Sequence, residues 1–200
     1  MNYNNCYEAL LAALHYGDSV IIEGEPGNGK SSLSIQAAAE LGWWSLHYNC
    51  SLGNETDILG LPGTIAGSDR VVWRPIGVWA EMLNSERPGI MVAEDLAHAP
   101  LGNQAPLMPL FHSLERRLGD KPIPPHVRMV ATANRVTDSG SGARALITPL
   151  RDRFVVRLLL DTDMKIAFDH LRDKYSTFEI AGMIIDAASA APSDAVRRLS

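Results

Sequence analysis

Residues 19–31 read Ser-Val-Ile-Ile-Glu-Gly-Glu-Pro-Gly-Asn-Gly-Lys-Ser, and this stretch decides the fold. Its last eight residues match the pattern G-x-x-x-x-G-K-[ST] in full. The apolar residues 19–23 predict a short buried strand, and residues 30–41 predict a helix that Gly42 closes. A strand, a glycine-rich turn and a helix in this order predict a loop that binds phosphate groups.

The residue types of this loop have a chemical reason. Glycines let backbone N–H groups curl around phosphate oxygens, and the N-terminus of the following helix adds a partial positive charge. Lys30 would reach the β- and γ-phosphates, and the Ser31 hydroxyl would coordinate Mg²⁺. We therefore predict ATP and Mg²⁺ as cofactors. The nucleotide-binding candidates are Gly24, Glu25, Pro26, Gly27, Asn28, Gly29, Lys30, Ser31 and Ser32, with a structural role as the alternative for Ser32.

A second apolar stretch ends in two acids: residues 89–95 read Gly-Ile-Met-Val-Ala-Glu-Asp. Mg²⁺ at a phosphate loop needs a carboxylate at the end of a nearby strand, and hydrolysis needs a group that orients water. We predict that Glu94 holds the metal together with Ser31, and that Asp95 is catalytic. The usual order is Asp then Glu, so each carboxylate is displaced by one methylene. Because errors of about 1 Å can cost on the order of 100-fold in rate, slow hydrolysis is expected.

Two other segments supply further candidates. Residues 128–134 predict a strand that ends at Asn134, which could hold the attacking water or sense the γ-phosphate; the alternative is an Asn that opens a turn. Arg151 and Arg153 are candidates for an arginine finger, a guanidinium that reaches a neighbouring subunit's γ-phosphate. Arg144 is a further candidate for that role, and solvated arginines are the alternative.

Composition narrows the class of protein. The 200 residues are 46% apolar and 20% charged, which is typical of a soluble globular protein. The net charge of −5 and the short basic clusters give no support for nucleic-acid binding. Cys6 and Cys50 form neither a metal motif nor a disulfide framework, and the six histidines, His47 among them, are interpreted as structural or surface residues. With no signal peptide and no apolar stretch long enough for a membrane span, the cytoplasm is the expected location.

Strands and helices alternate up to about residue 160, which predicts an α/β fold: a P-loop NTPase three-layer α/β/α sandwich around a parallel sheet. Residues 64–66 and 70–73 predict a hairpin, and Pro106 or Pro109 is expected to open a helix that runs to Leu118. After residue 161 only helical stretches follow, which predicts a short, truncated lid. The expected strands are 19–23, 43–49, 90–93, 127–133 and 154–160, and the expected helices are 7–15, 30–41 and 77–84, with a helical turn at 148–153.

The order of these motifs resembles AAA+ ATPases of the MoxR-like group, the helix-2-insert clade that includes dynein-related modules. Residues 89–100 (GIMVAEDLAHAP) are similar to that group's second Walker motif and the segment after it. Residues 57–62 (DILGLP) resemble its Asp-Leu-Leu-Gly segment. Residues 114–120 (LERRLGD) and 127–135 (VRMVATANR) resemble phage and bacterial members.

The resemblance implies an AAA+ core over residues 1–160, a helix-2-insert hairpin at 64–73 and a partial lid at 161–200. It implies that Glu94 and Asp95 take the roles of the two acids in the second Walker motif. It also implies that Asn134 is the first sensor of the γ-phosphate and that Arg153 is the arginine finger. The family forms homo-oligomeric rings, commonly hexamers, that remodel or activate partner proteins, often with a von Willebrand A domain.

Two other functions compete with this expectation. A nucleotide-binding switch or scaffold with little hydrolysis would explain the reversed acids and the short lid. A P-loop kinase would suit the chain length, but residues 161–200 carry no Arg/Lys cluster for an acceptor lid.

Overall fold

The computed structural model describes residues 1–161 apart from 66, 68, 115 and 139–141, so the predicted lid lies outside the described residues but for Asp161. A five-stranded sheet carries the fold, in the order β2-β5-β8-β1-β9, and every neighbouring pair is parallel. All carboxyl ends of its strands therefore meet at one edge. The strands are β1 (Val20–Gly24), β2 (Trp44–Asn49), β5 (Gly89–Glu94), β8 (Val127–Ala133) and β9 (Val156–Leu160).

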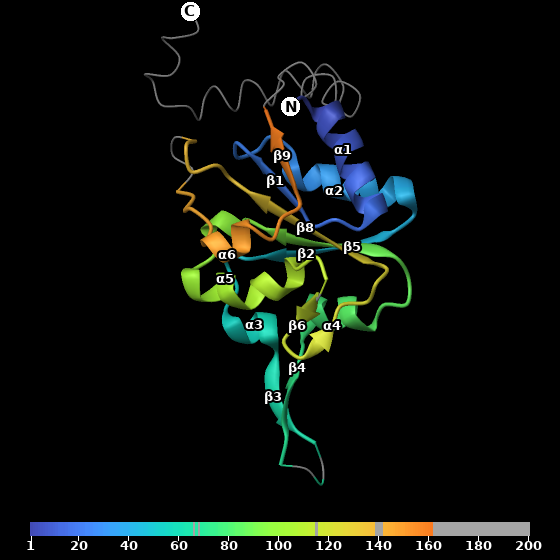
Figure 1. Cartoon of the computed structure of the whole chain (residues 1–200), viewed down its shortest axis with the longest axis vertical. Helices are drawn as coiled ribbons and strands as arrows, with labels where there is room; N and C mark the ends of the chain where they lie inside the picture. Colours follow the sequence, from blue (N-terminus) through green and yellow to red (C-terminus); the bar gives the residue numbers. More distant parts are fainter. Residues whose placement is uncertain (66, 68, 115, 139–141, 162–200) are drawn as a thin grey trace, which may run out of the picture. The chain divides into compact units, whose positions relative to one another are not determined.

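Successive side chains of the three central strands β5, β8 and β1 enter two different cores, one on each face of the sheet. Ile22 packs with residues of α1 (Tyr3–Tyr16) and α2 (Lys30–Leu41), such as Leu10 and Leu33. Ile21 packs in the other core with Trp79 and other residues of the opposite layer. The helices of that layer are α3 (Glu55–Leu59), α4 (Gly77–Asn84), α5 (Leu101–Leu107) and α6 (Thr148–Arg151). Figure 1 shows helices on both sides of the sheet, which confirms the predicted three-layer α/β/α sandwich.

Local sequence signals set several element ends. The predicted bounds of α2, α4 and β8 are confirmed, and Gly42 ends α2 in a left-handed conformation with φ 67°. Helix α1 begins four residues earlier than expected because the Asn2 side chain caps it, accepting a hydrogen bond from the Asn5 backbone N–H at 2.9 Å. No helix among the described residues is long and apolar enough to cross a membrane.

A hairpin of β3 (Leu61–Thr64) and β4 (Val71–Arg74) extends away from the five-stranded sheet in Figure 1. The predicted hairpin exists, but its first strand lies at 61–64 and not at 64–66. It is preceded by α3, which the sequence analysis did not predict. That helix forms because Asn54 and Asp57 cap each other's backbone N–H at 3.0 Å.

The predicted helix from Pro106 or Pro109 to Leu118 is wrong. Helix α5 begins at Leu101, contains Pro106 and ends at Leu107. Pro109 instead lies in the 3₁₀ helix η2 (Met108–Phe111). Leu118 lies in a small antiparallel pair of β6 (Arg117–Leu118) and β7 (Lys121–Pro122).

Candidate functional site

A cavity of about 500 Å³ opens at the carboxyl edge of the sheet, where β1, β5 and β8 end. Three segments that are far apart in the sequence supply its walls. The residues that line it are Pro26, Gly27, Gly29, Lys30, Ser31, Ser32, Glu94, Asp95, Thr132 and Asn134. The structure thus brings most of the predicted phosphate-loop residues together with both predicted acids and the predicted Asn.

The phosphate loop connects β1 to α2 and holds the ammonium of Lys30 within it. Lys30 is 8% exposed, and its Nζ donates to the backbone oxygens of Gly24 at 2.9 Å and Glu25 at 2.7 Å. Burial lowers the pKa of Lys30, while the carboxylates of Asp95 and Asp138 oppose that shift. The loop therefore places the Lys30 Nζ within the wall of the cavity.

Glycines shape this loop in two ways. Gly27 and Gly29 have φ values of 78° and 89°, a backbone conformation that side chains disfavour. Gly24 is needed for space, since a Cβ there would lie 2.4 Å from the Leu160 backbone oxygen. The same oxygen accepts a hydrogen bond from Asn28 Nδ2 at 2.9 Å, which ties the loop to the end of β9.

The two acids differ in their local structure. Glu94 is the last residue of β5, and its Oε1 lies 2.8 Å from His47 Nδ1. Asp95 has φ 53°, and no other non-glycine residue among those described has a positive φ. Aspartate is one of the few side chains that adopt this left-handed conformation readily. The backbone therefore gives a physical reason for the shorter acid at position 95.

Thr132 is a cavity residue that the sequence analysis missed. It is 2% exposed, and its Oγ1 accepts a hydrogen bond from the Asp95 backbone N–H at 3.3 Å. Asn134 follows the end of the same strand and also lines the cavity. The alternation of side chains along 128–134 was the signal that could have grouped Thr132 with Asn134.

A second missed residue, Arg135, lies beside the phosphate loop. Its Nε pairs with Asp138 at 3.0 Å, its Nη1 with Asp161 at 3.3 Å, and its Nη2 lies 3.8 Å from Glu25 Oε1. This guanidinium therefore links the loop to the ends of β8 and β9. Its position directly after Asn134 was the one signal in the sequence that could have indicated a place near the phosphate loop.

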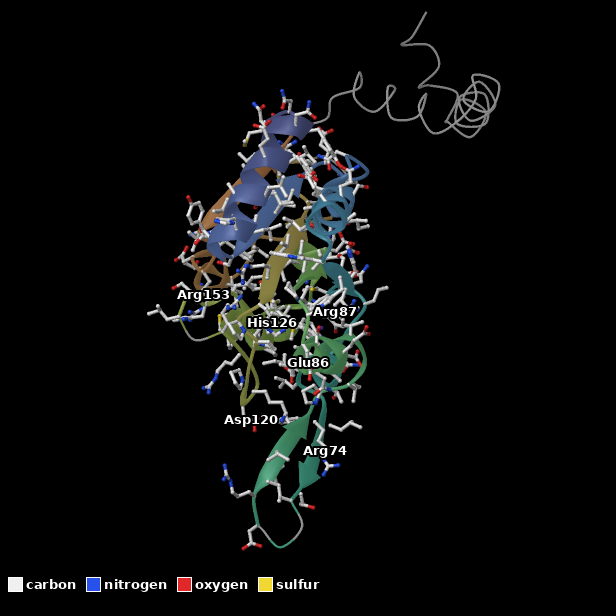
Figure 2. All side chains as sticks on the ribbon, turned by 90° about the vertical axis from the view of Figure 1, so that its right-hand side faces the viewer. Arg74, Glu86, Arg87, Asp120, His126 and Arg153 are labelled. Atoms are coloured by element: carbon white, nitrogen blue, oxygen red, sulfur yellow. The ribbon has the colours of Figure 1, made fainter. Side chains whose placement is uncertain are left out.

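None of the three arginines considered as fingers lines the cavity. The Arg153 backbone oxygen accepts a hydrogen bond from Ser19 Oγ at 2.7 Å, and Ser19 directly precedes β1. Arg153, labelled in Figure 2, therefore lies at the amino edge of the sheet, at the opposite end of the strands from the phosphate loop. Arg151 pairs with Asp152 at 3.4 Å, and the Arg144 backbone N–H donates to Ala97.

The side chains in the cavity suit a magnesium nucleotide. The hydroxyl of Ser31 and the carboxylates of Glu94 and Asp95 are hard oxygen donors, which Mg²⁺ prefers. Within the described ranges no group of three or more His, Cys, Asp and Glu side chains could hold a metal by itself. A bound Mg²⁺ would therefore take its remaining ligands from phosphates and water.

Comparisons with known proteins identify the class of fold. No protein-family model and no curated protein matches the chain. A candidate ATPase of Cytophaga hutchinsonii superposes with a TM-score of 0.62 at 17% identity, over 87% of this chain and 51% of that one. A RuvB mutant of Thermotoga maritima gives 0.54 at 20% identity, over 80% and 45%. NtrX of Brucella abortus in complex with ADP gives 0.52 at 18%, over 79% and 35%.

The chain therefore has the P-loop AAA+ α/β fold. It spans about half or less of the length of each of these solved structures.

Proposed function

We propose that this chain binds ATP with Mg²⁺ in the cavity at the end of β1, β5 and β8 and hydrolyses it, as an AAA+ ATPase of the MoxR-like type. One observation carries the proposal: Lys30, Glu94, Asp95 and Asn134 line a single cavity although 104 positions separate the first from the last. A phosphate loop, two acids and a polar strand end are the parts that ATP hydrolysis needs.

Each residue receives a role from its place. The backbone N–H groups of residues 24–31 and the Lys30 ammonium would bind the phosphates, and Ser31 and Glu94 would hold Mg²⁺. When bound, Mg²⁺ would neutralise charge on the phosphate oxygens. Asp95 would accept a proton from the attacking water, and Asn134 would orient that water.

The proposal extends to a homo-oligomer. Arg153 lies at the amino edge of the sheet, so it would serve as a finger only in the site of a neighbouring copy. A ring, such as a hexamer, places each finger beside the next phosphate loop. In the MoxR-like group such rings remodel or activate partner proteins, some with a von Willebrand A domain, and the exposed residues Leu61, Val71 and Trp73 of the hairpin offer a surface for such a partner.

A nucleotide-binding switch with little hydrolysis is the second candidate. The reversed acids favour it, because the shorter side chain of Asp95 lies where a glutamate usually activates water. The left-handed backbone of Asp95 would hold this arrangement in place.

The two candidates are separated by measuring phosphate release and molar mass, with and without ATP, on one purified sample. We expect wild-type protein to bind ATP, to gain mass with ATP and to release phosphate slowly, whereas Lys30→Ala loses ATP binding. Tight binding and assembly without phosphate release would favour the switch. A wild-type chain that stays monomeric and binds no ATP would overturn both.

A further inference from the structure

Strand β2 carries three polar side chains on one face. Its residues Trp44, Leu46 and Tyr48 pack against the core that contains Trp79. Because side chains alternate along a strand, Ser45, His47 and Asn49 point to the opposite face. The sequence analysis treated His47 as a structural or surface residue, and the function proposed above makes no use of it.

His47 lies between Ser45 and Glu94 in a short chain of hydrogen bonds. Its Nδ1 is 2.8 Å from Glu94 Oε1, and its Nε2 is 2.8 Å from Ser45 Oγ. An ionised carboxylate only accepts hydrogen bonds, so Nδ1 carries the hydrogen and donates it. The other ring nitrogen, Nε2, is hydrogen-bonded to the Ser45 hydroxyl. Both ring nitrogens are thus engaged, and the plane of the imidazole is fixed.

We infer that His47 is a positioning residue that orients the Glu94 carboxylate toward the magnesium nucleotide. The inference rests on the proposed function and adds His47 to the residues that would place the magnesium ion. Glutamate has one more rotatable bond than the aspartate usual at this position, and ordering it costs more conformational entropy. The hydrogen bond to Oε1 offsets this freedom and leaves Oε2 for the ion or its water. Partners of this kind typically change metal affinity or activity 10- to 100-fold.

The contact is not required to hold the sheet together. Strands β2 and β5 are already paired over six residue positions, including Asn49 with Glu94. The His47 and Glu94 side chains are 25% and 24% exposed, so the pair is not a buried core pair. A partly solvated hydrogen bond adds only modest stability. The remaining role for the His47–Glu94 contact is to orient the Glu94 carboxylate, which lines the cavity.

The test is a Mg²⁺ titration of ATP binding, followed with a fluorescent ATP analogue, on wild type and variants. We expect His47→Ala to raise the Mg²⁺ concentration for half-maximal binding about 10-fold. His47→Asn should stay within about 2-fold of wild type, because its amide nitrogen replaces Nδ1 as the donor to Glu94. His47→Gln, whose amide nitrogen replaces Nε2 instead, should behave like His47→Ala.

A double-mutant cycle separates positioning from a general structural effect. The carboxylate of Glu94→Asp is one methylene shorter and no longer reaches His47, so His47→Ala should add no further shift in that background. An equal shift in both backgrounds, or no shift in wild type, would overturn the inference. Wild-type protein that binds no ATP at any Mg²⁺ concentration would instead overturn the proposed function.

Discussion

At the scale of single residues, the order of the two acids is tied to the backbone at Asp95. The pattern Glu-Asp was visible in the sequence, and so was its expected cost for hydrolysis. Its physical reason was not, because the left-handed conformation with φ 53° depends on how β5 leads into the 3₁₀ helix η1 (Leu96–His98). Asparagine and aspartate accept this conformation better than glutamate does.

The left-handed backbone predicts how substitutions at position 95 affect stability. We expect Asp95→Glu to lower the free energy of unfolding by about 1 kcal/mol and Asp95→Asn to change it by less than about 0.5 kcal/mol. Denaturant unfolding of both variants measures this difference. An Asp95→Glu variant as stable as wild type would show that the backbone does not select the shorter acid.

The burial of Tyr48 predicts how the stability of the protein depends on pH. Its hydroxyl is buried with no hydrogen-bond partner among the described residues, and burial raises its pKa from 10.0 to about 12. A raised pKa in the folded state favours the neutral side chain, so its contribution to stability is complete below pH 10 and is lost as the pH rises toward 12. Tyr48→Phe should therefore lose less stability between pH 10 and pH 12 than wild type, as measured by denaturant unfolding. Identical losses would contradict the role of burial.

The sequence anticipated some parts of the site better than others. Lys30, Ser31, Glu94, Asp95 and Asn134 were predicted because they follow strands in recognisable patterns. Thr132, Arg135 and the contacts of His47 were not, since each depends on which strands become neighbours.

At the scale of elements, boundaries were predictable where a local signal sets them. Gly42 ends α2, and the apolar stretch 127–133 fixes β8. The prediction of a helix that runs to Leu118 was wrong, because the position of a proline alone does not say whether a helix begins or ends there. The hairpin strand at 61–64 shifted from the expected 64–66 because its pairing with β4 selects the register.

The base of the hairpin depends on Gly60. It has φ 90°, and a Cβ there would lie 2.0 Å from the Arg74 backbone oxygen. We expect Gly60→Ala to lower the free energy of unfolding by about 2 to 4 kcal/mol, since it adds a backbone clash to the strain.

Gly42→Ala is the matched control for this clash. Its φ is 67°, and an added Cβ would meet nothing within 4 Å. It should cost about 1 to 2 kcal/mol in the same unfolding experiment. Equal costs at the two positions would show that the contact with Arg74 does not constrain the hairpin.

At the scale of the whole molecule, the parallel sheet explains why distant motifs meet. The order β2-β5-β8-β1-β9 places the Asn134 strand β8 next to β1, which leads into the phosphate loop, and places the acidic strand β5 on the other side of β8. Alternating strands and helices predicted a parallel sheet, but only the structure supplies the strand order. The same geometry leaves Arg153 at the far edge of the sheet.

A site completed by a second copy predicts rescue on mixing. Lys30→Ala and Arg153→Ala should each release less than about a tenth as much phosphate as wild type, because one loses ATP binding and the other loses the finger. An equimolar mixture should recover activity, since some intact phosphate loops then face an intact Arg153. A mixture no more active than the sum of its components would show that Arg153 does not act between copies.

The central claim is that the cavity hydrolyses ATP through Asp95. It is tested most directly by comparing phosphate release of wild type and Asp95→Asn at saturating ATP, with ATP affinity measured on the same samples. We predict equal affinity and at least about a 100-fold slower release for the variant, because the amide cannot accept the proton of the attacking water. Equal release rates, or no release from wild-type protein that binds ATP, would contradict the claim.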